Sequence, residues 1–138
     1  MASVVVEYSA NLKDKIHPQR LCKLIGVTIM ETGEGLFPTA GIRVRAYKAK
    51  DYFIGDGDDD YAFVAINVRI AAGRAEEDKR RTFDAVFKVV KDELKEVYDK
   101  RVMSLSMDVE EFGERLAYKA NRLHEKLGTK PLANVVAI

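Results

Sequence analysis

The sequence is poor in the residues that mark disulfide-stapled, metal-binding or membrane-spanning proteins. Cys22 is the only cysteine, so no disulfide can form within the chain, and this suits a reducing compartment. Its two histidines, His17 and His124, are too far apart for a spaced metal motif. No apolar run approaches the roughly 20 residues that cross a bilayer, and no secretory signal is visible. We therefore expect a cytoplasmic protein with no bound metal and no membrane contact.

The chain also lacks an excess of charge of either sign. Its 23 basic and 22 acidic side chains give a formal net charge of +1, which does not favour nucleic acid as a partner. What it has is the composition of a globular protein, with 47% hydrophobic residues. A chain of 138 residues can bury a core without staples. We predict one domain over residues 1–138.

The first half of the chain shows a strand pattern, a helix pattern and a second strand pattern. Residues 4–9 are rich in β-branched side chains and predict a strand. Apolar spacing after Pro18 predicts a helix that stops at Gly33. Residues 41–47 alternate, which predicts a strand with Arg43 and Arg45 together on the face opposite its apolar residues.

The second half repeats this order. Residues 61–70 predict a strand, residues 76–101 a long helix with one apolar face, and residues 103–110 a further strand. Two βαβ units can share one four-stranded sheet with both helices on one face, so the predicted fold class is α+β. Because the strands are apolar, we expect other subunits to cover the second face. A weaker helical pattern ends near residue 127, and residues 128–138 form an apolar extension.

Three arginines are candidates for binding an anion. A guanidinium group holds a carboxylate in a fork of two parallel hydrogen bonds, so Arg43, Arg45 and Arg74 could together bind a dianion. For any one arginine, a solvated surface position is the common alternative. The acidic run at residues 56–60 fails as a calcium loop because Tyr61 and Asn67 occupy its glycine and glutamate positions. We interpret it as a solvated turn.

Several stretches, taken together and in order, resemble the 5-carboxymethyl-2-hydroxymuconate isomerase family of the tautomerase superfamily. They are Val6-Glu7-Tyr8-Ser9-Ala10-Asn11, residues 36–45, residues 60–64, Ile70-Ala71-Ala72-Gly73-Arg74, Leu105-Ser106 with Glu110-Glu111, and Tyr118-Lys119-Ala120-Asn121 with His124. The resemblance covers about residues 4–127.

This resemblance implies a homotrimer of two βαβ units per chain, with no metal and no organic cofactor. It implies a keto–enol isomerisation of an unsaturated di- or tricarboxylate in aromatic-acid catabolism. In the family, an amino-terminal proline moves the proton and arginines hold the substrate carboxylates. By position, Arg43 and Arg74 match arginines of the family site, and Arg45 is a third candidate nearby.

The chain departs from the family at its start, because residue 2 is Ala rather than Pro. If Met1 is removed, the primary amine of Ala2 takes the place of the proline, and an α-amine titrates close enough to neutrality to accept a proton. If Met1 stays, the amine is displaced by one residue. In the third alternative, the chain is a catalytically impaired homologue, a trimer that binds small acids or another protein.

Overall fold

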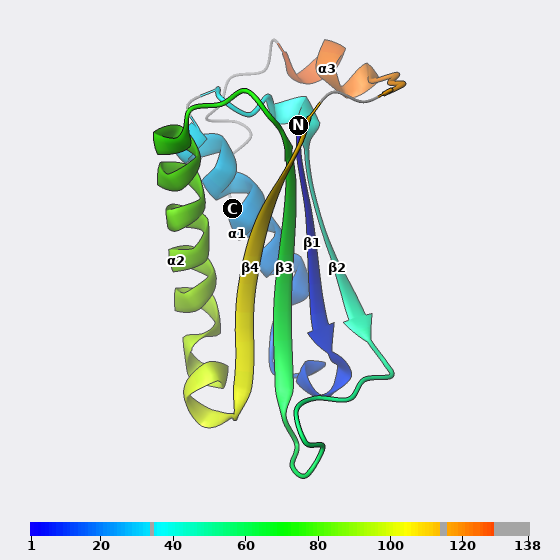
Figure 1. Cartoon of the computed structure of the whole chain (residues 1–138), viewed down its shortest axis with the longest axis vertical. Coiled ribbons are helices and arrows are strands. Elements are labelled where there is room, and N and C mark those ends of the chain that lie inside the picture. Colours follow the sequence, from blue (N-terminus) through cyan, green and yellow to red (C-terminus); the bar gives the residue numbers. More distant parts are fainter. Residues whose placement is uncertain (34, 114–115, 129–138) are drawn as a thin grey trace.

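The computed structural model describes residues 1–33, 35–113 and 116–128 (Figure 1). Its strands are β1 (Ala2–Ser9), β2 (Ile42–Ala49), β3 (Ala62–Ala71) and β4 (Met103–Phe112). Its helices are α1 (Pro18–Gly33), α2 (Glu76–Lys100) and α3 (Arg122–Leu127), and two 3-10 turns are η1 (Ala10–Leu12) and η2 (Thr39–Gly41). The predicted extension therefore lies outside the described residues from 129 onwards.

The four strands form one mixed sheet in the order β2-β1-β3-β4. The outer pairs, β1 with β2 and β3 with β4, are parallel, and the central pair of β1 with β3 is antiparallel. The register places Val4 beside Val44 on one side and Val68 on the other. This arrangement confirms two βαβ units in one four-stranded sheet.

Both long helices lie on the same face of the sheet, as predicted (Figure 1). Alternate strand residues point into the core between this face and the helices. The largest fully buried members from the strands are Ile66, Ile70, Val4, Val6, Val64 and Val68, and those from the helices are Leu21, Ile25, Ile29 and Val86. Burying such side chains is the main stabilising term of the fold.

The opposite face is more polar than the sequence led us to expect. The apolar strand residues point to the helices, so residues of the other parity, such as Arg45, Asn67 and Asp108, lie on the open face and are exposed. Across it, Arg69 pairs with Glu110 at 3.8 Å. The argument that this face needs cover because it is apolar was therefore wrong.

The ends of the elements show small departures from the predicted boundaries. α2 ends one residue early because Arg101 is extended and its Nη2 donates to a carboxylate oxygen of Asp60 at 2.8 Å. Asn11 also donates to Asp60, at 2.9 Å. The acidic run is therefore a turn, as predicted, but its last carboxylate anchors the turn to the domain rather than lying free in solvent.

One end of the sheet gathers segments that are distant in the sequence. β1 and β2 begin there and β3 and β4 end there, because the two parallel pairs run in opposite directions. The amino terminus, η2 and α3 all lie at this end (Figure 1). Two predicted arginines lie at or near it as well, Arg43 near the start of β2 and Arg74 just after β3.

Candidate active site at the amino terminus

A cavity of about 630 Å³ opens beside the amino terminus. Met1, Pro38, Gly41 and Arg43 form one side, and the segment from 116 to 121 with His124 forms the other. The cavity is thus made from the start of β1, the η2–β2 junction and the carboxyl-terminal segment. A concave pocket that combines apolar walls with a few polar groups is the usual form of a small-molecule site.

The amino group of Met1 lies at this cavity and has a perturbed pKa. Burial lowers its pKa below the ordinary value of 8.0, and the positive charges of Arg74, Lys119 and Arg43 lower it further. Desolvation and like charges both disfavour the ammonium form. A larger fraction of this amine is therefore neutral near pH 7, with its lone pair free to take a proton.

Arg74 is held in place by its neighbours. Its Nε donates to the carbonyl of Leu36 at 3.2 Å, and its Nη1 donates to the carbonyl of Ala71 at 2.9 Å. The guanidinium carbon lies 4.4 Å from the ring centroid of Phe37, which is buried. Among the described residues the Nη2 donors have no partner, so a fixed guanidinium keeps part of its fork for an anion.

The two arginines of β2 have different surroundings. Arg43 lines the cavity, and its charge acts on the amino group. Arg45 lies two residues further along the same face, where its Nη1 donates to Ser3 Oγ at 2.9 Å. Neither Arg45 nor Arg74 is among the cavity-lining residues, although the charge of Arg74 acts on the amino group. The structure therefore brings Arg43 and Arg74 to the amino terminus, and leaves Arg45 further along the open face.

Ala2 lies within the sheet, where it is fully buried beside Ile42 and Ile70. It does not line the cavity while Met1 precedes it. Removing Met1 would place the new amine one residue closer to the sheet, a shift of about 3.8 Å along the chain. Burial there would again favour the neutral amine.

The carboxyl-terminal segment supplies cavity residues whose roles sequence reasoning did not identify. Asn121 ties it down, because its Nδ2 donates to the carbonyl of Ala40 at 3.2 Å. The Asn121 side-chain oxygen also caps α3 by accepting from the backbone N–H groups of Leu123 and His124. Lys119 and His124 thereby come to lie at the cavity. The stretch Tyr118–Asn121 was noted in the family resemblance, which is the signal that pointed to it.

The remaining candidates from the sequence lie elsewhere. His17 is exposed just before α1, and Cys22 is half-buried within it, where burial raises the pKa of the thiol. Within residues 1–33, 35–113 and 116–128, no group of three or more His, Cys, Asp or Glu residues could hold a metal ion. In the same ranges, no helix is long and apolar enough to span a membrane.

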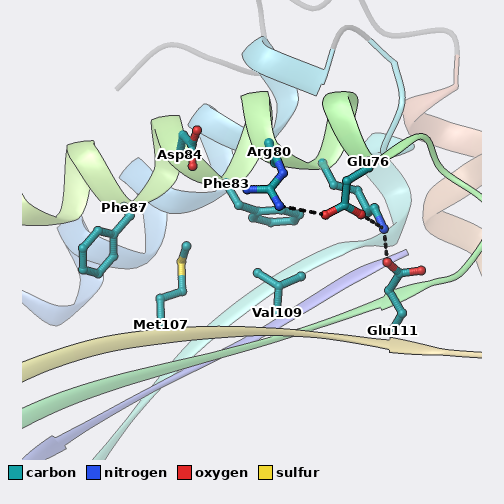
Figure 2. A pocket seen from close by; sticks show the side chains of 9 residues that line it. Glu76, Arg80, Phe83, Asp84, Phe87, Met107, Val109 and Glu111 are labelled. Atoms are coloured by element: carbon teal, nitrogen blue, oxygen red, sulfur yellow. Dashed lines mark hydrogen bonds and ion pairs between the residues drawn. The ribbon is translucent and has the colours of Figure 1, made fainter.

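A second cavity, of about 400 Å³, lies between α2 and the edge strand β4 (Figure 2). Its walls include Phe83, Phe87 and Met107, and both of its basic side chains, Lys79 and Arg80, are already paired with acids. Lys79 forms ion pairs with both Glu76 and Glu111 at one end of this groove. Paired charges leave little reason to bind an acid there, so the amino-terminal cavity is the better candidate for chemistry.

Comparison with known proteins identifies the family of this chain. The sequence model of 5-carboxymethyl-2-hydroxymuconate isomerase matches residues 2–127. The chain belongs to this family. A 5-carboxymethyl-2-hydroxymuconate delta-isomerase of Escherichia coli is 31% identical over 124 residues, which are 90% of this chain and 97% of that protein.

Solved structures of the family share the fold. A 5-carboxymethyl-2-hydroxymuconate isomerase from Deinococcus radiodurans R1 superposes with a TM-score of 0.80 at 36% identity, covering 91% of this chain and 92% of that one. A crystal structure of another 5-carboxymethyl-2-hydroxymuconate delta-isomerase gives a TM-score of 0.85 at 28% identity and covers 95% of both chains. The predicted tautomerase-like fold is thus confirmed, and the chain is an isomerase by family.

Proposed function

We propose that this member of the family isomerises an unsaturated di- or tricarboxylate of aromatic-acid catabolism, with its amino-terminal amine as the proton carrier. One observation carries the proposal: the amine has a lowered pKa and lies at a cavity beside Arg43, within the field of Arg74. A neutral amine and unpaired guanidinium donors are the two components that a keto–enol isomerisation of an acid requires.

In this mechanism the amine removes a proton from the enol hydroxyl, or from a carbon next to the carbonyl in the ketone form, and delivers it to another carbon of the conjugated system. Negative charge develops on the enolate oxygen between the two transfers. Arg43 and Arg74 hold the carboxylates and stabilise this charge, and Arg74 is held in position before substrate arrives. All steps use groups of this chain, so the proposal needs no metal and no organic cofactor.

Whether Met1 is retained decides which amine acts. With Met1 present, the amine is the one whose pKa is lowered by burial and by the three cations. With Met1 removed, the primary amine of Ala2 stands where the family has its proline. Either amine can carry the proton, but the two differ in reach by one residue, and proton transfer is sensitive to such displacements.

The proposal includes a homotrimer located in the cytoplasm. The sheet has one face without helices (Figure 1). The exposed side chains on this face include Arg45 and Tyr47, and Phe63 is partly exposed. A mixed face of this kind suits contacts between subunits, which are commonly polar in part. Sedimentation equilibrium tests the trimer directly, because a mass three times the chain's 15.5 kDa is expected.

Turnover measured by ultraviolet absorbance tests the function. The substrates are 5-carboxymethyl-2-hydroxymuconate and phenylenolpyruvate, and the wild type is compared with Ala2→Pro, each after intact-mass analysis of the amino terminus. Activity of the wild type supports the isomerase. Activity of Ala2→Pro alone would show an intact pocket on a homologue without its base, which then binds small acids. Inactivity of both variants would contradict the proposed reaction.

A further inference from the structure

The groove between α2 and β4 is lined with apolar side chains from both of its walls. Phe83 and Phe87 project into it from the helix, and Met107 and Val109 project from the strand (Figure 2). Val109 remains 39% exposed, although the strand before it packs against the core. Because both basic side chains of the groove are paired with acids, no cation is left for an acidic ligand. The groove therefore suits an uncharged apolar occupant.

The outer edge of β4 borders this groove. β4 is the last strand in the order β2-β1-β3-β4, and from Met103 to Glu111 the strand that pairs with it in the described part of the chain is β3. On the outer edge of such a strand, the backbone N–H and C=O groups of alternate residues can pair with an additional strand. Every second side chain of that strand would then lie over the groove. The edge thus offers backbone pairing where the groove offers apolar contact.

The segment of residues 132–138 has the composition of such a strand. It reads Leu132-Ala133-Asn134-Val135-Val136-Ala137-Ile138, with no charge, no glycine and no proline. Pro131 precedes it, and proline is tolerated as the first residue of a strand. Uncharged segments of about six or seven residues with high β-propensity are an aggregation hazard when they are left exposed. The segment also lies beyond residues 2–127, the part that matches the family, so its binding place has to be argued from this chain.

The described chain ends at the same end of the molecule as the groove begins. Gly128 follows α3, which lies at the end of the sheet where β4 ends and α2 begins (Figure 1). Glu76 and Glu111 line the groove at this end. Fully extended, residues 129–138 span about 33–36 Å, which is close to the length of a ten-residue strand such as β4. A segment that entered from this end would run opposite to β4, and its attachment to the chain would keep its local concentration high.

We propose that residues 132–138 bind in the groove of their own chain as an antiparallel strand added to the outer edge of β4. The added strand covers the exposed part of Val109 with apolar side chains and pairs with the outward backbone groups of β4. It also closes an edge that could otherwise pair with other chains. The proposal does not use the amino-terminal cavity, so it is independent of the proposed reaction.

Amide hydrogen exchange on the full chain tests this proposal. We expect the amides of residues 132–138 to exchange at least about tenfold more slowly than those of a free peptide of residues 129–138. Val109→Asp places a charge in the groove and should bring these rates to within about twofold of the free peptide. Val109→Lys repeats the test with the opposite charge.

Val102→Asp is the matched control for the groove. Val102 is exposed, precedes β4 and does not line the groove, so the same substitution there should leave the segment protected. The amides of β1, at the centre of the sheet, should remain protected in every variant, which shows that each variant is folded.

Three results would overturn the assignment. Free-peptide exchange rates for residues 132–138 in the wild type would show that the segment is unbound, and slow exchange along β4 in the same sample would then assign the edge to another subunit. Protection of the segment that survived both Val109 substitutions in folded protein would place it elsewhere. Recovered protection in isotope-labelled Val109→Asp chains, refolded with an excess of unlabelled wild type, would assign the segment to the groove of a second copy.

Discussion

A Cβ atom added at Gly41 would lie 3.1 Å from the Cα of Met1 and 3.6 Å from its amino nitrogen. The last residue of η2, just before β2, thus forms one wall against the amino terminus. Gly41→Ala should displace the amine, and misplacement of a base by about 1 Å can cost roughly a hundredfold in rate. We expect kcat/KM to fall by at least about tenfold, measured with phenylenolpyruvate.

Gly113→Ala is the control for this prediction, because a Cβ there meets no atom of the described residues within 4 Å. Intact mass decides how the Gly41→Ala result is interpreted. If Met1 has been removed, the close contact is absent and the effect should shrink. Wild-type activity of Gly41→Ala in protein that retains Met1 would contradict the placement of the amine against this wall.

The pH dependence of turnover follows from the lowered pKa of the amino group. In the proposed mechanism the neutral amine is the active form, so kcat/KM should rise with pH and level off, with its midpoint below 8.0. Lys119→Gln removes one of the charges that disfavour the ammonium form, so its midpoint should move to higher pH. A rate that falls as pH rises through this range would exclude the amine as the base.

Arg74 should contribute to binding more than to folding. Arg74→Ala removes two hydrogen bonds and the contact with Phe37, which we expect to lower the free energy of unfolding by about 1–3 kcal/mol. Its affinity for pentanedioate should fall below detection by calorimetry. Urea denaturation measures the change in the free energy of unfolding separately from the change in affinity.

Arg69→Ala is the control variant for Arg74→Ala. Arg69 also lies over an aromatic ring, that of Phe112, at 5.6 Å, and has one acid partner, but it is directed onto the open face. Arg69→Ala should therefore leave the affinity for pentanedioate unchanged. If Arg74→Ala kept the wild-type affinity, the assignment of Arg74 to carboxylate binding would fail.

Thr82 offers a stabilising substitution within α2. Its side chain is fully buried, and its Oγ1 has no hydrogen-bond partner among the described residues. Thr82→Val replaces an unsatisfied hydroxyl with a methyl group of similar size, so we expect a gain of about 1 kcal/mol in urea denaturation. Thr28→Val is the control, since Thr28 Oγ1 donates to the carbonyl of Leu24 at 2.7 Å and the gain should be absent.

The sequence was sufficient to predict the layers and one side of the site. Alternation from Ile42 onwards placed Arg43 and Arg45 on one face, because a strand has a period of two. The apolar spacing of α1 and α2 similarly predicted which helix faces are buried. These are local patterns, and they depend only on neighbours a few residues away.

The other side of the site depends on contacts between distant residues. The hydrogen bond from Asn121 to Ala40 joins positions 81 residues apart, and no periodic signal predicts it. The same holds for the contact of Arg74 with Phe37, which distinguishes Arg74 from a solvated arginine. The polarity of the open sheet face was misjudged because total apolar content does not say how it divides between two faces.

The central claim is that the amino-terminal amine carries the proton, and its chemical removal tests this most directly. Transamination with pyridoxal phosphate converts an α-amine to a carbonyl, and a lowered pKa favours reaction there over the lysines. Turnover of phenylenolpyruvate is measured before and after, with intact mass reporting conversion. We predict that turnover falls in proportion to the fraction of protein converted. In fully converted protein kcat should be lower by roughly 10²–10⁴-fold. Unchanged turnover in fully converted protein would contradict the account.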